Sequence, residues 1–158
     1  MRQNGILLDE EKIMFLKNAG VGNINISIDS DKEEMHDHLR KYQGCFSAAI
    51  NSLKECVKHG ISCLISTYAS KGAIKNGTLE KIIQLGKNIN VSGVKILFPI
   101  LSGKWRNCES EKLNKTEEEY IESITDPSFV YIEDALEMIK NKGKGCSAME
   151  KNLIYIWP

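Results

Sequence analysis

The stretch from Gly20 to Ser30 constrains the fold most, because it predicts a strand that ends in a carboxylate. A glycine is typical of a helix end, and residues 23–28 alternate isoleucine with asparagine or serine, as a strand does. Ser27 and Asp29 would then stand where a parallel strand passes into the loop that follows it. Because α/β folds place their ligand chemistry at that end of a strand, we expect both residues to belong to a binding site.

The rest of the first hundred residues repeats the pattern of a helix followed by a strand. The predicted helices are 9–19, 46–59 and one that starts at Thr78, and the predicted strands are 23–28, 61–67 and 94–98. A short helix is expected in the polar stretch 29–44, and a loop over 68–77. Such βαβ units close into a barrel or form an open parallel sheet. Three strands alone leave unpaired edges, so we expect part of a domain whose exposed sheet edge favours self-association.

The chain after residue 99 is less regular. We expect a polar loop over 102–115, which contains Trp105 and Cys108. Thr116 to Glu119 fits a capping box at the start of a helix, and Asp126-Pro127 is expected to begin a further helix that includes Ile132. Residues 153–156 are predicted to form a final strand.

Composition excludes several classes of partner. The 21 basic and 21 acidic residues cancel, so no basic excess is available to hold nucleic acid. No apolar run approaches the length of a membrane span, and no apolar segment follows the N-terminus as a secretory signal requires. The five cysteines are odd in number and scattered, which argues against a disulfide framework. We therefore expect a cytoplasmic α/β protein with neither a nucleic-acid nor a membrane partner.

A series of short motifs covers nearly the whole chain in a fixed order. They are Asn4-Gly5-x-Leu7-Leu8, Ala19-Gly20-Val21 leading into Ile26-Ser27-Ile28-Asp29, His36-Asp37-x-Leu39-Arg40 with Gly44-x-Phe46, Lys58-His59-Gly60-Ile61, and Gly145-Cys146-Ser147-Ala148. Together they resemble the radical S-adenosylmethionine (radical SAM) enzymes, in particular the subgroup with a C-terminal SPASM or twitch extension. The resemblance implies a partial parallel (β/α) barrel in residues 1–142 and the beginning of that extension in residues 143–158.

The resemblance also implies an activity. In this family a [4Fe-4S] cluster, held by a Cys-x-x-x-Cys-x-x-Cys loop, binds S-adenosylmethionine and cleaves it reductively to a 5′-deoxyadenosyl radical. SPASM members often modify a peptide or protein, which is therefore the expected partner. The cysteines at 45, 56, 63, 108 and 146 nowhere show the loop's spacing. We therefore expect a piece of a longer enzyme that is inactive by itself, holds no cluster and binds S-adenosylmethionine weakly or not at all.

The residues that match the family's motifs acquire roles by the same resemblance. Ser27 matches a strand-end residue that contacts S-adenosylmethionine, and Arg40 matches an arginine that pairs with its methionyl carboxylate, as a guanidinium fork suits. Asp29 would accept a hydrogen bond from a ribose hydroxyl or orient Arg40. Asn4 would face the same open end of the barrel. Cys146 matches the first auxiliary-cluster ligand of the extension, a role it could have only in a full-length parent.

Simpler interpretations stand beside these. Ser27 and Asp29 could merely cap the next helix, and Arg40 could be a solvated surface residue. A metal site at His36 and His38 is disfavoured, because residues two apart on a helix point about 200° apart. At the level of the whole chain, one alternative is a cluster-free binding or scaffold module built on the same barrel. Another is an unrelated (β/α) barrel enzyme with a phosphate site, for which Lys71-Gly72 is the weak candidate.

Overall fold

The computed structural model describes residues 2–99 and 109–133, which form an α/β fold. The strands are β1 (Arg2–Gln3), β2 (Asn23–Ser27), β3 (Ser62–Tyr68), β4 (Gly93–Leu97) and β5 (Val130–Glu133). The helices are α1 (Glu10–Asn18), α2 (Glu33–Arg40), α3 (Cys45–Lys58), α4 (Lys71–Lys75), α5 (Thr78–Ile89) and α6 (Lys115–Ser123), with a 3-10 turn, η2, at Glu109–Glu111. Trp105, Cys108, Cys146, the extension over 143–158 and the strand over 153–156 lie outside the described residues.

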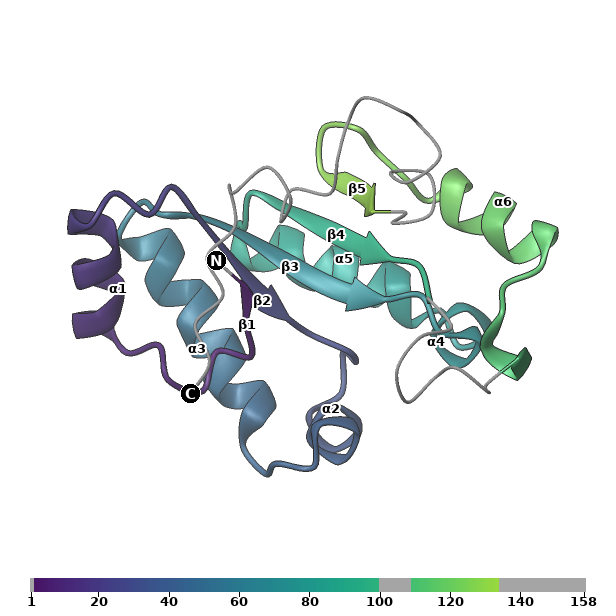
Figure 1. Ribbon diagram of the computed structural model, residues 1–158, viewed down its shortest axis with the longest axis horizontal. Helices are drawn as coiled ribbons and strands as arrows, with labels where there is room; N and C mark the ends of the chain where they lie inside the picture. The colour runs from purple at the N-terminus through teal and green to yellow at the C-terminus, as the bar shows by residue number, and fades with distance from the viewer. Residues whose placement is uncertain (1, 100–108, 134–158) are drawn as a thin grey trace.

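The five strands form one parallel sheet in the order β1-β2-β3-β4-β5. Each strand therefore pairs with its neighbour in sequence, and a helical connection returns the chain to the same end of the sheet every time (Figure 1). This is the topology of an open segment of a (β/α) barrel. The predicted fold class is thereby confirmed, and within the described residues β1 and β5 are the strands at the sheet edges.

The core lies between the sheet and the two helices α3 and α5. Ile24, Ile26 and Ile28 share one face of the β2 segment, since residues two apart in a strand point the same way. They join buried side chains of the neighbouring strands and helices in one cluster, among them Ile65, Val94, Ile96, Leu53, Cys56, Ile82 and Ile83. Because this face is wholly apolar, the polar residues of β2 are left for the opposite face.

The turn after β1 is fixed by close packing against α3. Gly5 has a φ of +84°, and a Cβ placed on it would lie 2.7 Å from the Cα of Ala49. The buried Ser52 hydroxyl lies 2.8 Å from the carbonyl oxygen of Gly5 and 2.9 Å from that of Leu8. A residue without a side chain and a small buried donor thus hold the end of β1 on α3.

Most predicted elements are confirmed, and three local expectations were wrong. The expected loop 68–77 contains α4, which begins because Ser70 accepts a hydrogen bond from the amide of Ala73. The capping box of α6 is formed by Asn114 and Glu117, two residues before the expected pair. Ile132 lies in β5 and not in a helix, because pairing with β4 extends the sheet over 130–133.

Candidate functional site

An ion pair lies directly beyond the end of β2. The Arg40 Nε atom is 2.5 Å from Oδ2 of Asp29, and Arg40 Nη2 donates a hydrogen bond to Oδ1 at 2.9 Å. Both side chains are mostly shielded from solvent, with 29% of the Arg40 side chain and 20% of the Asp29 side chain exposed. The structure therefore brings together two of the residues that the sequence assigned to one site. The arginine is contributed by the last residue of α2, so the helix sets its position.

His36 ties the same helix to the same loop. Its ring is buried and its Nδ1 accepts a hydrogen bond from the backbone amide of Asp29 at 3.0 Å. The ring packs edge-on against Phe46, with centroids 5.7 Å apart. Burial lowers the pKa of His36 below its ordinary value, and this effect outweighs the opposing pull of Asp29 and Asp37. A neutral imidazole is the form that can accept a hydrogen bond.

Asp37 fastens α2 to the start of α3. Its carboxylate accepts hydrogen bonds from the amide of Gly44 at 2.6 Å and from the amide of Phe46 at 2.8 Å. These bonds, with that from Phe46 foremost, lower the pKa of Asp37. His36 therefore attaches α2 to the loop before it, and Asp37 attaches α2 to the start of α3 after it. These contacts fix the helix that carries Arg40.

Ser27 lies on the sheet face opposite the apolar core, together with two polar residues that the sequence analysis did not single out. Ser27 is the register partner of Ser66 on β3, and Asn25 shares its face two residues earlier. All three are buried. Asn25 Oδ1 and Ser66 Oγ find no hydrogen-bond partner within the described part of the chain. The alternation of Ile with Asn and Ser in β2 was the available signal, and it predicts a face with free hydrogen-bonding capacity for a ligand.

The ion pair borders a pocket of about 350 Å³ that is lined by Asp29, Leu39, Arg40, Tyr68 and Ser70. The guanidinium and the carboxylate therefore lie beside space that a small polar molecule could enter. Asn4 follows β1 at the same end of the sheet, because β1 runs parallel to β2. Its side chain is used in its own turn, where Oδ1 accepts a hydrogen bond from the amide of Ile6 at 3.3 Å.

The remaining sequence candidates do not join this site. His38 is exposed while His36 is buried, so the two histidines do not form a metal site. Lys71 opens α4 and lies 3.7 Å from Glu117 of α6, where it forms an ion pair. Cys45, Cys56 and Cys63 are buried free thiols in the core, as expected of structural cysteines.

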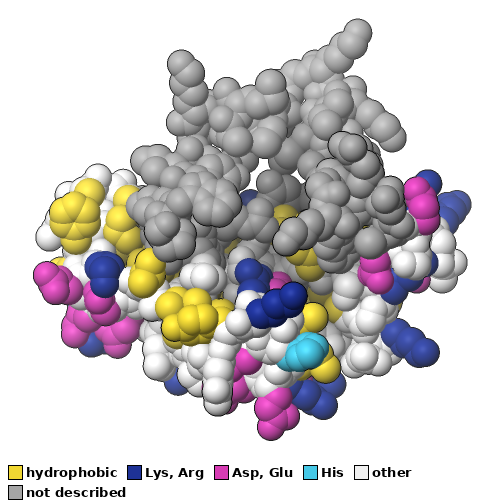
Figure 2. Space-filling model, turned by 60° about the horizontal axis from the view of Figure 1, so that its bottom comes forward, with side chains coloured by type: hydrophobic (Ala, Val, Ile, Leu, Met, Phe, Trp, Pro, Cys, Tyr) yellow, Lys and Arg dark blue, Asp and Glu magenta, His cyan; other side chains and the backbone are white. Residues whose placement is uncertain are grey.

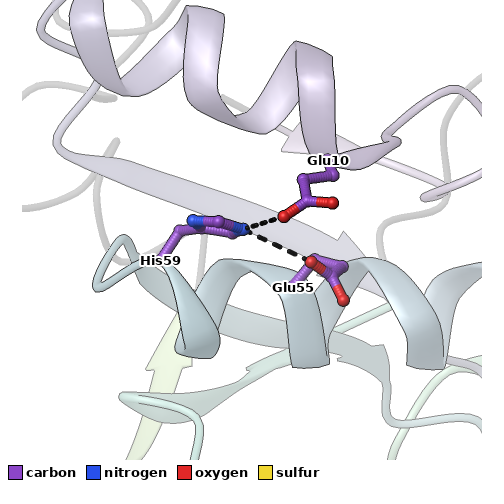
Figure 3. A group of neighbouring side chains, drawn as sticks. All are labelled: Glu10, Glu55 and His59. Carbon is purple, nitrogen blue, oxygen red and sulfur yellow. Dashed lines mark hydrogen bonds and ion pairs between the residues drawn. The ribbon is translucent and has the colours of Figure 1, made fainter.

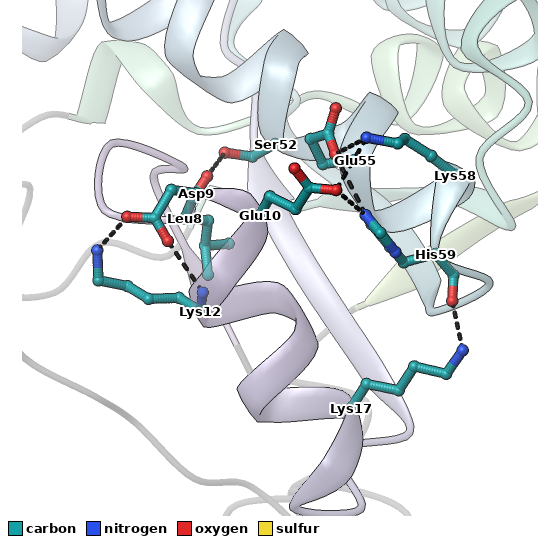
Figure 4. A network of polar contacts seen from close by, with 9 residues as sticks. All are labelled: Leu8, Asp9, Glu10, Lys12, Lys17, Ser52, Glu55, Lys58 and His59. Carbon is teal, nitrogen blue, oxygen red and sulfur yellow. Dashed lines mark hydrogen bonds and ion pairs between the residues drawn. The ribbon is translucent and has the colours of Figure 1, made fainter.

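A second polar cluster joins the first turn of α1 to the last turns of α3 and its C-cap residue, His59. His59 Nε2 lies 3.0 Å from Oε1 of Glu10 and 3.4 Å from Oε2 of Glu55, an arrangement that could in principle hold a metal ion (Figure 3). The Lys58 ammonium, however, lies 3.0 Å from the same two carboxylate oxygens. Lys17 also donates to the carbonyl oxygen of His59 at 2.7 Å (Figure 4). The Lys58 ammonium therefore already supplies positive charge to both carboxylates, and we assign the cluster to contact between the two helices.

The described surface shows no region of a single charge on the face seen in Figure 2, where acidic and basic side chains are interspersed. Hydrophobic side chains on that face lie in separate groups. None of the helices in the described ranges combines the length and apolar character that a membrane crossing needs.

The segment that contains this site matches a known protein family. The sequence model of one family covers β1 through β3 and reaches into α4. Residues 1–73 match the radical SAM superfamily. The matched segment includes Ser27, Asp29, His36 and Arg40, so the whole ion-pair site falls inside it.

Curated relatives match most of this chain. The chain is 29% identical to an AdoMet-dependent heme synthase of Methanosarcina barkeri over 118 residues. The aligned residues are 75% of this chain and 33% of that protein. It is 36% identical over 114 residues to an Fe-coproporphyrin III synthase of the same organism, over 72% of this chain and 28% of that protein. The chain thus spans about a third of the length of these relatives.

Several solved structures share the fold of this chain. Native anSMEcpe with bound AdoMet superposes with a TM-score of 0.59 at 17% identity, over 92% of this chain and 43% of that one. Streptococcus suis SuiB bound to the precursor peptide SuiA gives a TM-score of 0.64 at 12% identity, over 96% of this chain and 36% of that one. The parallel sheet with its helices therefore has the fold of a partial (β/α) barrel shared with these proteins.

Proposed function

We propose that this chain is part of a radical SAM enzyme and contributes residues that bind S-adenosylmethionine. Arg40 would bind the methionyl carboxylate, Ser27 would donate a hydrogen bond, and Asp29 would accept one from a ribose hydroxyl. The observation that carries the proposal is the Asp29–Arg40 pair at the carboxyl end of β2, beside a pocket and inside the segment that matches the superfamily.

The chemistry of the site suits this ligand. A guanidinium fork matches a carboxylate in shape and charge, and a carboxylate accepts well from sugar hydroxyls. The buried polar atoms of Asn25 and Ser66 lie along the same sheet face and have unused hydrogen-bonding capacity within the described residues.

The described residues do not supply the ligands of an iron–sulfur cluster. Cys45, Cys56 and Cys63 are buried free thiols, and only Cys56 and Cys63 contact each other, through a hydrogen bond between their thiols. No group of three cysteines lies together in the described ranges. The residues present there do not fit a [4Fe-4S] cluster. In the proposal the cluster therefore belongs to another part of the whole enzyme, and this chain alone is inactive. Bound to such a cluster, S-adenosylmethionine would supply the hydrogen-abstracting chemistry of the family.

Two substrate classes are open for the whole enzyme. A peptide or protein is the class implied by the SPASM resemblance, and SuiB, a protein of the same fold, is solved with its precursor peptide. An iron porphyrin is the second candidate, favoured by relatives at 29% and 36% identity whose names specify heme and Fe-coproporphyrin synthesis. Cys146 as an auxiliary-cluster ligand in residues 143–158 and a cytoplasmic location remain parts of the proposal.

Binding can be tested with the chain as it stands. A ¹⁵N-labelled sample is titrated with S-adenosylmethionine to millimolar concentration, which detects weak binding by NMR. We expect shifts concentrated at the amides of residues 27–30 and at the Arg40 side chain. Shifts absent from these positions, or spread over the surface without them, would refute the assignment of the site.

A further inference from the structure

One residue of α2 holds the backbone of Asp29 and another holds its side chain. His36 accepts from the Asp29 amide, and Arg40 binds the Asp29 carboxylate. The two are four residues apart on α2, so they lie on the same face of the helix one turn apart. Asp29 is thus held at two points, and the histidine contact determines how its backbone is presented to the arginine.

The hydrogen bond specifies the state of the imidazole. Nδ1 accepts, so it carries no proton, and the neutral ring carries its proton on Nε2. Nε2 is buried and has no hydrogen-bond partner in the described part of the chain. Leaving a buried donor unpaired costs free energy. An apolar residue would avoid that cost, so the acceptor on Nδ1 is the feature that a histidine supplies.

We propose that His36 is a positioning residue for S-adenosylmethionine: its neutral ring holds the Asp29–Arg40 pair in its binding geometry, and protonation of the ring releases the pair. The inference rests on the proposed function for the identity of the ligand. A proton on Nδ1 would face the Asp29 N–H, turning an acceptor into a second donor. The ring would have to turn away, and Asp29 would lose the contact that fixes its backbone.

The groups around the ring determine the direction of the pH effect. Asp29 from the end of β2 and Asp37 from α2 favour the charged ring, while Arg40 from α2 and burial disfavour it, burial most strongly. From α3, Phe46 contributes an uncharged ring, and Cys45 stays a neutral thiol because burial raises its pKa. Burial therefore favours the neutral ring, and the pKa of His36 lies below its ordinary value.

The first arm of the test needs no ligand. NMR of the ¹⁵N-labelled chain reports the imidazole tautomer, the Asp29 amide and the Arg40 Nε–H as pH is lowered from 8 to 5. We expect Nδ1 to be the unprotonated nitrogen at neutral pH, and the Asp29 and Arg40 signals to change together with the His36 titration. A ring protonated on Nδ1 at neutral pH would overturn the inference, as would Asp29 and Arg40 signals that ignore the titration.

The second arm uses two variants and S-adenosylmethionine. In His36→Asn, Oδ1 stands as many bonds from the backbone as Nδ1 does and accepts without titrating, so binding at neutral pH should persist and its acid sensitivity should vanish. His36→Leu should weaken binding at every pH. In the unmodified chain, affinity should fall by up to about tenfold for each pH unit below the pKa of His36. Acid sensitivity retained in His36→Asn would contradict the inference.

The two arms separate this inference from the proposed function. If S-adenosylmethionine fails to bind at any pH while the Asp29 and Arg40 signals follow His36, the ligand assignment fails and the positioning role stands. If the ligand binds at the expected residues while these signals and the affinity ignore His36, the positioning role fails alone.

Discussion

Arg40 meets Asp29 across the loop that joins β2 to α2, with its Nε atom 2.5 Å from one carboxylate oxygen and Nη2 2.9 Å from the other. Without a ligand, the guanidinium is thus neutralised by a neighbour of the same site. A carboxylate arriving from S-adenosylmethionine would share the guanidinium with Asp29. The hydrogen bonds of His36 and Asp37 fix the position of α2, so Arg40 is preorganised before a ligand binds.

The turn at Gly5 provides a stability prediction with a matched control. Gly5→Ala should destabilise the fold by about 2 kcal/mol or more, because a left-handed φ and a contact of 2.7 Å with Ala49 both oppose a side chain. Gly20→Ala has nearly the same φ, +83°, but open space around the new Cβ, so it should cost only about 1 kcal/mol. Urea unfolding of both variants measures the difference. Equal losses would show that the contact with α3 is unimportant.

Ser52 should matter more than its neighbours on α3. Ser52→Ala removes a buried hydroxyl that serves two carbonyl oxygens of the β1–α1 turn, which should cost about 1–3 kcal/mol. Ser47→Ala on the same helix removes an exposed hydroxyl that donates to Glu33 at 2.6 Å, and should change stability by less than about 0.5 kcal/mol. Denaturant melts give both values, and a Ser52 loss as small as that of Ser47 would contradict the structure.

The cluster between α1 and α3 makes a prediction about pKa. The Lys58 ammonium, followed by His59, holds the pKa of Glu10 below its ordinary value. Lys58→Ala should therefore raise the pKa of Glu10 toward that value, whereas Lys54→Ala, on an exposed position of the same helix, should leave it in place. Carboxyl ¹³C shifts followed through an acid titration measure this. A Glu10 pKa unchanged by Lys58→Ala would show that the ion pair does not persist in solution.

Burial of His36 should also appear in the pH dependence of stability. Because its pKa in the fold lies below the ordinary 6.5, the unfolded chain binds the proton first as pH falls. The free energy of unfolding should thus decrease as pH drops below about 6.5, until the folded ring is protonated too. His36→Asn should flatten this part of the curve, in denaturant melts collected at several pH values. An equal decrease in the free energy of unfolding in His36→Asn and in the unmodified chain would show that His36 does not cause it.

Much of the fold followed from the sequence because its signals were local. The glycine after a helix and the Ile alternation in β2 identified α1 and β2 within a residue or two. Ile132 was misplaced because its role depends on pairing with β4, a contact that local periodicity does not encode. The α6 cap was misassigned because two overlapping capping patterns, at Asn114 and Thr116, differ only in how the chain enters the helix.

For the site, the sequence predicted the partners but not their support. Ser27, Asp29 and Arg40 were identified from their position after a strand and from the family resemblance. The role of His36 was missed, because on sequence alone it belonged to a polar run in which His38 looked equivalent. Only the packing of α2 buries one and exposes the other. Asn25 and Ser66 likewise become noticeable when the register brings them onto the face of Ser27.

The most direct test of the central claim is the affinity for S-adenosylmethionine of Arg40→Ala against that of Lys54→Ala, measured by NMR titration of the chain. Charge-assisted hydrogen bonds to a carboxylate contribute about 1.5–3 kcal/mol, so Arg40→Ala should weaken binding by roughly 10- to 100-fold. Lys54→Ala should bind as the unmodified chain does. Equal affinities for the two variants would contradict the assignment of Arg40 and, with it, of this site.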